Sequence, residues 1–484
     1  MSRAAAVRAD LRLLIDGQAV RGEGEPLHVV NPATEDECAV VAGASPEQVA
    51  AAVEAAAAAF GEGPWGSPEE RAGALERLAD GIERRHRELV EAIVTEVGSP
   101  VALAESLQVA VPAAHLRHYA KLALEDRTER LPPDPGPPGS ASIVAYRPVG
   151  VVAAIAAYNY PLLLAVHKLG AALAAGCTAV LLPSPRTPIA TLLFGEAVRA
   201  AGLPAGVVNV LAGGAEAARA LTEHPRVDKI AFTGSEAVGT QVMRQAAAGT
   251  RGVVLELGGK SAALIAPDAD LAAVVPGIHF RYARNGGQAC AAPTRLLVPE
   301  SAWDDFAAIS EAAYRDLRVG DPWSADVTVG PMISAAHRDR VERFVADAVA
   351  GGARIIAGGG RPPVERGWFT NPVLLAGAAP GSPVAQEEIF GPVAVAFPYR
   401  DLDEAVALAN GTRYGLHAYV YTADTESGVA LAARLRSGSV SVNGGGAFRP
   451  DAPMGGFGAS GVGRELGRWG VHEYLEPQHV QWAR

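Results

Sequence analysis

The stretch that decides the fold is residues 150–183, GVVAAIAAYNYPLLLAVHKLGAALAAGCTAVLLP. It begins with a short apolar run, continues with a helical pattern over 161–175, and ends in a second run, CTAVLLP, typical of a buried strand. A helix between two buried strands predicts a parallel βαβ unit with a right-handed crossover. Residues 150–183 therefore indicate an α/β architecture.

The same pattern repeats toward the C-terminus. The runs GVVNVLAG, DKIAFTG and VVLEL are strand-like, and helical patterns cover 189–201, 215–223 and 237–247. Alternating strands and helices predict a doubly wound parallel sheet. Ligands of such sheets bind beyond the carboxyl ends of the strands, where Asn159, Pro183, Gly234 and Glu256 fall.

Other elements are expected on both sides of this region. Residues 11–43 alternate apolar and polar positions around turn signals, which favours small antiparallel strands, and helical patterns cover 45–96 and 113–124. After Cys290 a second set of strand-like runs alternates with helical patterns over 303–317, 335–351, 403–410 and 426–436; these runs are TRLLVP, ARIIAGG, VAVAFPY, AYVYT and SVSVN. We expect a separate α/β domain there.

Residues 130–148 interrupt the helical pattern with five prolines before Ser140, followed by the strand-like SIVAY. They are either a flexible linker or an extended arm, and the strand favours the arm. The tail ends in the alternating HVQW, which predicts an edge strand. Because an arm needs a partner edge, we expect a homo-oligomer, either a dimer or a dimer of dimers.

Composition excludes several classes of function. A net charge of −11 argues against a nucleic-acid partner. The sequence has neither a signal peptide nor an apolar run long enough for a membrane helix, so no membrane partner is expected. Its three cysteines, Cys38, Cys177 and Cys290, suit neither a disulfide framework nor a metal site, and they predict a reducing, cytoplasmic setting.

Two reactive side chains lie in residues 253–295. Cys290 ends the glycine-rich NGGQAC, whose backbone N–H groups can stabilise a thiolate and an oxyanion; a lone cysteine is otherwise a small buried apolar residue. Glu256 precedes LGGK at a strand end, where it is either a solvent-facing carboxylate or a half-buried base with a raised pKa.

Three further motifs each have a structural and a functional interpretation. Asn159 either caps the helix that begins near Pro161 or donates to an oxyanion. FTGSEAVG, residues 232–239, is either a tight strand-to-helix turn or a pyrophosphate site. In QEEIFGPV, Glu388 and Phe390 are either one solvated and one packed residue, or partners of a nicotinamide ribose and its ring.

Blocks along nearly the whole chain resemble the NAD(P)-dependent aldehyde dehydrogenase superfamily: AIAAYNYP, VDKIAFTGS, LELGGKS, NGGQAC, EEIFGPV and PMGGFGASGVGRELG. The resemblance implies that Cys290 is the nucleophile, Glu256 the base and Asn159 the oxyanion donor, with Lys168 near the active site. It also implies that NAD or NADP is bound by Ile155, Ala156, Tyr158, Leu182, Ser184, Pro185, Phe232, Thr233, Gly234, Ser235, Val238, Leu257, Gly258, Glu388 and Phe390. The implied substrate pocket is Tyr160, Leu163, Leu164, His167, Ala289, Ala291, Phe448 and Met454.

The implied fold is a Rossmann-type cofactor domain (1–127 and 148–256), a catalytic domain (257–458) and a β-arm oligomerisation element (128–147 and 459–484). The chain departs from the family where KPSE is usual: it has Leu182 in place of the ribose-binding lysine and Pro185 in place of the acid. Loss of that carboxylate, with Arg186 beside it, predicts that NADP is tolerated. Tyr158 also replaces the usual tryptophan, and Gly458 replaces a frequent lysine.

The expected activity is oxidation of an aldehyde to a carboxylic acid through a cysteine thiohemiacetal and a thioester. Small alanines beside Cys290 and an apolar lining favour a medium-sized aliphatic or aromatic aldehyde. Three alternatives remain. Arg449 in contact with a carboxylate would indicate a semialdehyde, release of the thioester to CoA would make the enzyme CoA-acylating, and the altered ribose motif leaves open a non-catalytic scaffold.

Overall fold

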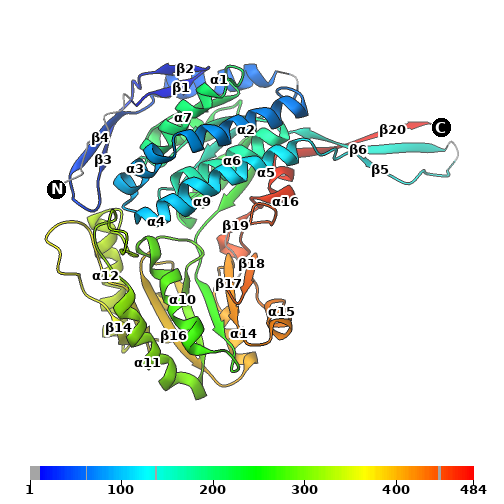
Figure 1. The fold of residues 1–484 in the computed structure, drawn as a ribbon. Helices are drawn as coiled ribbons and strands as arrows, with labels where there is room; N and C mark the ends of the chain where they lie inside the picture. Colours follow the sequence, from blue (N-terminus) through cyan, green and yellow to red (C-terminus); the bar gives the residue numbers. More distant parts are fainter. Residues whose placement is uncertain (1–10, 62, 137–138, 445–448, 484) are drawn as a thin grey trace.

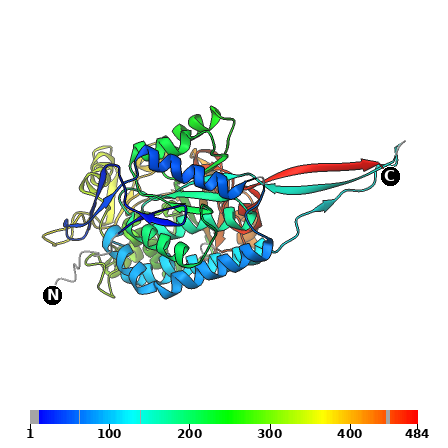
Figure 2. The same ribbon diagram turned by 90° about the horizontal axis from the view of Figure 1, so that it is seen from above.

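The computed structural model describes residues 11–61, 63–136, 139–444 and 449–483. Figure 1 shows two α/β bodies, one above the other, and a β-arm that extends from the upper body. The view in Figure 2 shows this arm leaving the body as a narrow ribbon. Both bodies contain sheets flanked by helices, so the predicted α/β class is confirmed.

The sheet of the upper body has the order β19-β11-β10-β7-β8-β9-β1-β2. Strands β7 to β11 are parallel: the chain moves outward from β7 to β9 and returns on the other side of β7 with β10. This reversal confirms the doubly wound sheet and creates a crevice at the carboxyl ends of β7 and β10. The strand bounds are β1 Leu13–Ile15, β2 Gln18–Val20, β7 Val151–Ile155, β8 Thr178–Leu182, β9 Val208–Val210, β10 Lys229–Thr233, β11 Gly252–Glu256 and β19 Gly461–Val462.

Helices pack on this sheet, and α6 is buried along its whole length. Helix α1 begins where the sequence predicts, because Ser45 and Gln48 form a capping box and Pro46 occupies the first turn. The helix bounds are α1 Pro46–Phe60, α2 Pro68–Arg84, α3 His86–Val97, α4 Val101–Leu103, α5 Ala110–Ala123, α6 Pro161–Ala175, α7 Ile189–Ala200, α8 Ala215–Glu223, α9 Glu236–Ala247 and α16 Gly467–His472. The predicted hairpin upstream is β3 Pro26–Val30 with β4 Glu37–Ala42.

The lower body has the sheet order β14-β15-β16-β13-β12-β17-β18, with apolar clusters on both faces. Its strands are β12 Ser261–Ile265, β13 Pro293–Pro299, β14 Arg354–Gly358, β15 Val373–Ala376, β16 Val393–Tyr399, β17 His417–Tyr421 and β18 Ser439–Val442. Its helices are α10 Leu271–Ala283, α11 Trp303–Ala313, α12 Ala335–Ala350, α13 Pro383–Gln386, α14 Leu402–Asn410 and α15 Thr425–Ala432. Strands β12 and β15 were not predicted. No helix separates β12 from β11, and β15 is only four residues long.

The arm is a sheet of β5 (Glu129–Arg130), β6 (Ser140–Pro148) and β20 (Leu475–Ala483). The tail strand β20 pairs with β6 along its whole length, so residues 130–136 and 139–148 form an arm rather than a flexible linker. The preceding part of the tail packs differently. Strand β19 joins β11, and Leu466, Val471 and Tyr474 lie in the core of the upper body. The sequence assigned 459–484 to one oligomerisation element, but in the structure only β20 extends into the arm.

Within the described ranges, every helix is too short or too polar to cross a bilayer. The same residues contain no group of three histidine, cysteine, aspartate or glutamate side chains arranged to hold a metal ion. Cys38 and Cys177 are buried and free, and Cys290 is free and partly exposed. Cys290 is therefore the most exposed cysteine residue of the three.

Candidate active site

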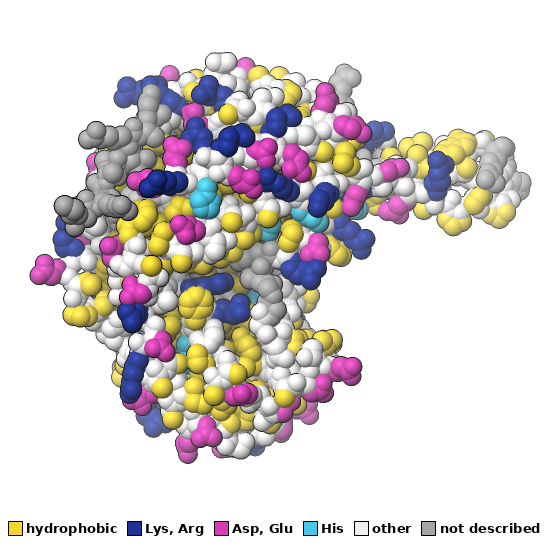
Figure 3. Space-filling model, in the orientation of Figure 1, with side chains coloured by type: hydrophobic (Ala, Val, Ile, Leu, Met, Phe, Trp, Pro, Cys, Tyr) yellow, Lys and Arg dark blue, Asp and Glu magenta, His cyan; other side chains and the backbone are white. Residues whose placement is uncertain are grey.

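A cavity of about 1000 Å³ lies between the two bodies, beyond the carboxyl ends of β7, β8, β10 and β11. Figure 3 shows the molecule hollowed in this region, with hydrophobic and basic side chains inside. The lining includes Cys290, Glu256, Asn159 and every residue predicted to hold the cofactor. Residues from distant parts of the sequence thus share one chamber.

Cys290 follows the 3-10 turn Arg284–Gly287, in which Asn285, Gly286 and Gly287 have positive φ. A Cβ on Gly287 would lie 2.2 Å from the backbone carbon of Gly391, so this close approach requires glycine. Burial, with smaller contributions from the charges of Glu388 and Glu256, raises the pKa of the Cys290 thiol to about 12, although the backbone N–H groups of Ala291 and Cys290 act to lower it. The turn supplies the predicted N–H groups, but burial outweighs them.

Asn159 lies next to the cysteine turn. Its Nδ2 donates to the carbonyl oxygen of Gln288 at 3.0 Å, and Tyr160 occupies the N-cap position of α6, so the helix-cap interpretation of Asn159 is wrong. Gln288 is buried, and its side chain bonds to the N–H of Ile333 and the carbonyls of Asn285 and Pro331. An asparagine amide carries two protons, and the bond to Gln288 uses one of them.

Glu256 ends β11 and is 3% exposed, so the solvent-facing interpretation is wrong. Both carboxyl oxygens are buried and have no hydrogen-bond partner among the described residues. A Cβ on Gly455 would lie 2.9 Å from Oε1, so the carboxyl packs against this glycine. Burial raises the pKa of Glu256 well above its ordinary value, and the charge of Glu465 adds to the effect. An unpaired buried carboxyl is costly and typical of a functional group.

Lys168 and His167 lie behind the cavity rather than in its lining. The Lys168 ammonium is fully buried and donates to Glu465 Oε1 and Thr233 Oγ1, both at 2.5 Å. His167 Nδ1 lies 3.3 Å from Glu465 Oε2. The sequence-based placement of His167 in the substrate pocket is therefore not supported, because its side chain faces the tail. Glu465 was missed because it lies 297 positions from Lys168.

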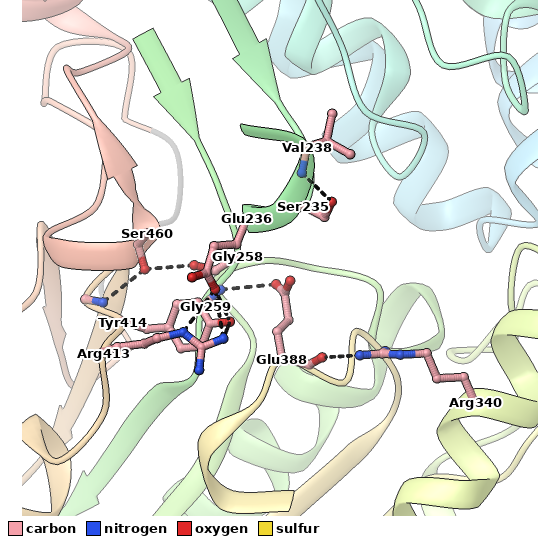
Figure 4. A network of polar contacts seen from close by, with 11 residues as sticks. Ser235, Glu236, Val238, Gly258, Gly259, Arg340, Glu388, Arg413, Tyr414 and Ser460 are labelled. Atoms are coloured by element: carbon pink, nitrogen blue, oxygen red, sulfur yellow. Dashed lines mark hydrogen bonds and ion pairs between the residues drawn. The ribbon is translucent and has the colours of Figure 1, made fainter. Parts of the chain in front are cut away.

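The cavity has a polar middle section. Ser235 caps α9 by accepting from the Val238 N–H, and Glu388 Oε1 accepts from the Gly259 N–H at 3.1 Å. In Figure 4, Glu388 points toward the Gly258–Gly259 turn, while Arg340 approaches from α12. The Arg340 guanidinium donates to the carbonyls of Glu388 and Ile389. Burial raises the pKa of Glu388 to about 7, against the effect of the Gly259 N–H.

Two groups of hydrogen bonds link the upper and lower bodies beside this section, and Figure 4 shows both. Glu236, in the first turn of α9, pairs with Arg413 at 2.8 Å and accepts from the Tyr414 hydroxyl. Ser460 donates to the carbonyl of Gly258 and accepts from the N–H of Gly415. Neither contact was predicted, because the partners lie far apart in the sequence.

One end of the cavity is lined by the segments that follow β8 and β9. Leu182, Ser184, Pro185 and Arg186 form one wall, and the other wall includes residues 213–215, Ala218 and Val238. A Cβ on Gly214 would meet no atom within 4 Å, so the space beside this glycine is open.

The other end is mainly apolar. The lining residues predicted for substrate are Tyr160, Leu163, Leu164, Ala289, Ala291 and Met454. Phe448 lies outside the described residues. Arg449 lines the cavity but forms a two-point ion pair with Asp451, which satisfies its charge. Further lining residues that the sequence analysis did not identify are Arg281, Arg284, Ile333, His337, His417 and Tyr419.

The chain is similar to known proteins over nearly its whole length. Residues 19–480 match the model of the family described as "Aldehyde dehydrogenase family". The chain is 40% identical to geranial dehydrogenase of Castellaniella defragrans, with 94% of each chain covered. It is 39% identical to 2-hydroxymuconic semialdehyde dehydrogenase of a Pseudomonas species, covering 97% of this chain and 99% of the relative. A mutant aldehyde dehydrogenase C from Pseudomonas syringae, solved with NAD+ and octanal, matches with a TM-score of 0.92 and 37% identity over 99% of this chain and 97% of that one.

Proposed function

Because the chain belongs to the aldehyde dehydrogenase family, we propose that it oxidises an aldehyde to a carboxylic acid with NAD or NADP, through a thioester on Cys290. The observation that carries the proposal is the convergence of Cys290, Asn159 and Glu256 in one cavity, beside Glu388 and Phe390. A nucleophile, an oxyanion donor and a base are the groups that such a reaction requires.

In the first half of the reaction, the thiol of Cys290 loses its proton and its sulfur attacks the aldehyde carbon. The thiol proton passes to solvent, and Glu256 acts only in the second half of the reaction. The Asn159 amide and the Cys290 N–H hold the oxyanion of the thiohemiacetal. A nicotinamide held beside Glu388 and Phe390 would supply the hydride acceptor, and on loss of hydride the thiohemiacetal on Cys290 becomes a thioester.

In the second half, Glu256 takes a proton from water, which attacks the thioester. Asn159 again stabilises the oxyanion, and the thiolate of Cys290 leaves as the carboxylic acid forms. The buried carboxyl of Glu256 has no other hydrogen-bond partner among the described residues, so it is available to a water molecule. Its raised pKa suits a group that must accept a proton near neutral pH.

The lining residues fit a dinucleotide. The N-terminus of α9, capped by Ser235, offers backbone N–H groups to a pyrophosphate, and the carboxylate of Glu388 suits ribose hydroxyls. Phe390 lies edge-on to Tyr158, with 5.8 Å between ring centres, and suits the nicotinamide. Near the adenosine ribose, Leu182 and Pro185 offer no carboxylate to repel a 2′-phosphate, and Arg186 is exposed beside them. These features support use of NADP as well as NAD.

For the substrate, we propose an aldehyde with a medium-sized apolar body. The support is the apolar wall formed by Tyr160, Leu163 and Leu164, extended by Leu103, Leu107 and Val111. The test is a panel of benzaldehyde, octanal and succinate semialdehyde with both cofactors, in the presence and absence of CoA. Turnover without CoA is expected, and a strict CoA requirement would indicate the acylating alternative instead. No NAD(P)H formation with any aldehyde would favour a scaffold.

We also propose a homo-oligomer in the cytoplasm. The arm exposes the apolar side chains of Leu131, Val480 and Trp482, and its edge strands suit pairing with a second copy of the chain. The free cysteines suit a reducing compartment.

A further inference from the structure

We infer that Tyr158 is a positioning residue, whose hydroxyl acts through Gln288 to orient the amide of Asn159. The role rests on the proposed function, in which Asn159 holds the oxyanion that forms on Cys290, and adds one residue to it. It belongs to the hydroxyl of Tyr158 rather than to the ring, so it differs from the cofactor contact that the sequence predicts. Tyrosine stands here in place of the usual tryptophan, so this hydroxyl is a feature of the chain's own sequence.

The hydroxyl of Tyr158 helps to fix the side chain of Gln288. It donates to the side-chain oxygen of Gln288 at 3.1 Å, and the backbone N–H of Ile333 donates to the same oxygen at 2.9 Å. The side-chain nitrogen of Gln288 donates to the carbonyls of Asn285 and Pro331. Because Gln288 is fully buried, these four hydrogen bonds hold its amide in one orientation.

The main chain of Gln288 contacts the oxyanion donor directly. Its carbonyl accepts one amide proton of Asn159 at 3.0 Å, and the Asn159 carbonyl accepts from Nδ2 of Asn285 at 3.2 Å. Hydrogen bonds to an amide are directional, so the bond to Gln288 also decides where the second Asn159 proton points. Gln288 lies two positions before Cys290, so a shift of Gln288 would move the amide relative to the sulfur.

The ring of Tyr158 has contacts that do not depend on its hydroxyl. The Thr187 hydroxyl donates to the Tyr158 carbonyl at 3.2 Å, and the ring lies edge-on to Phe390. Phe390 has a φ of 58°, and His337 Nε2 lies 2.7 Å from its carbonyl oxygen. Burial, with a contribution from the charge of Glu388, raises the pKa of Tyr158, so its hydroxyl keeps the proton that it donates. Tyr158→Phe therefore removes one donor and leaves the ring packing in place.

The experiment removes this hydroxyl alone. Full-length wild-type enzyme and Tyr158→Phe are mixed with octanal and NAD in single turnover, with enzyme in excess, so that NADH formation reports the acylation half of the reaction. Because Gln288 keeps its bond from Ile333, the rate should fall roughly 5- to 10-fold, as for one lost hydrogen bond, and KM for NAD should change about twofold or less. An unchanged rate would overturn the role, as would a raised KM for NAD alone, which indicates a cofactor contact.

A double variant tests whether the hydroxyl acts through Asn159. Asn159→Ala alone should lower the rate by a factor of about 100 or more. Adding Tyr158→Phe should then cost no more than about twofold, because residues that act together have non-additive effects. The same loss as in the wild-type background would mean that Tyr158 acts elsewhere, and would overturn the role.

The matched control is Tyr399→Phe. The Tyr399 hydroxyl donates to the carbonyl of Ile265 at 2.6 Å, is buried, and lies outside the lining of the cavity. This variant should lower the melting temperature without changing the single-turnover rate. An equal loss of rate in Tyr399→Phe would mean that any buried tyrosine hydroxyl has this effect, and would contradict a specific role for Tyr158.

Hydrolysis of 4-nitrophenyl acetate separates this role from the proposed function. The Cys290 sulfur attacks the ester carbonyl, an oxyanion forms, and 4-nitrophenolate leaves as the thioester forms, so neither cofactor nor hydride transfer is needed. Release of the first equivalent of 4-nitrophenolate should slow in Tyr158→Phe by a factor similar to that for octanal. Slower release in this variant without aldehyde oxidation by wild type would contradict the proposed function alone. Aldehyde oxidation by wild type, with unchanged release in Tyr158→Phe, would contradict the positioning role alone.

Discussion

Replacement of Glu256 by glutamine separates the two halves of the proposed reaction. The amide keeps the size of the side chain but cannot take a proton from water. Since Cys290 and Asn159 are unchanged, formation of the thioester should continue, and its hydrolysis should slow. A positioned general base contributes a factor of about 100 to 10,000, so steady-state kcat should fall by roughly that amount.

The raised pKa of Glu256 gives this prediction a pH signature. Below the raised pKa, the ionised fraction of the carboxyl increases about tenfold per pH unit, so wild-type deacylation should increase with pH until the raised pKa is reached. The glutamine variant should lack this dependence. In a rapid-mixing assay it should release one NAD(P)H per active site in a burst, followed by a slow steady state. A variant that keeps the wild-type steady-state rate, or that loses the burst, would refute the assignment of Glu256 as the deacylation base.

The same substitution should stabilise the fold. The pKa of Glu256 is raised in the folded protein, so as pH rises above the ordinary value of 4.5 the unfolded chain ionises first. Folding is then penalised by about 1.4 kcal/mol for each pH unit, until the folded pKa is reached. Glu256→Gln removes this penalty, and its melting temperature should exceed that of wild type by a margin that grows from acidic to neutral pH. A constant margin would contradict the buried, unpaired carboxyl.

Three further outcomes are expected. Cys290→Ala should abolish dehydrogenase activity without lowering the melting temperature, and residual turnover in this variant would disprove the nucleophile. Lys168→Met leaves the buried carboxylate of Glu465 without its ammonium partner, which should cost about 3–5 kcal/mol, and adding Glu465→Leu should restore most of the melting temperature. Arg186→Ala should raise KM for NADP more than for NAD; strong exclusion of NADP by wild type would contradict the interpretation of Leu182 and Pro185.

The sequence predicts the fold well where strand-like and helical patterns alternate regularly. Over 150–256, the helices predicted at 161–175 and 215–223 have those bounds in the structure. In this region, short apolar runs typical of buried strands alternate with stretches of helical periodicity. Strand β12 was not predicted, because only a short glycine-containing turn, and no helix, separates it from β11. The tail was assigned to one element, because the short β19 and α16 carry too little periodicity to reveal that they pack on the upper body.

The candidate site was predictable where one short motif holds the reactive group. Cys290 and Glu256 are each marked by adjacent glycines, and both line the cavity. Contacts between distant segments carry no local signal, which is why Gln288, Glu465 and Ser460 were missed. Arg281 and Arg284 also lie in residues 253–295, but only the geometry reveals that they line the cavity.

The pairing of Lys168 with Glu465 has a consequence for biosynthesis. On the ribosome, the upper body emerges early, and α6 can collapse long before residue 465 leaves the exit tunnel. Until then the ammonium of Lys168 cannot form its ion pair with Glu465 when α6 is buried, and β11 lacks its neighbour β19. Nascent chains should therefore wait in an incompletely packed state that chaperones can recognise, and truncation before residue 465 should yield aggregation-prone material rather than a smaller working enzyme.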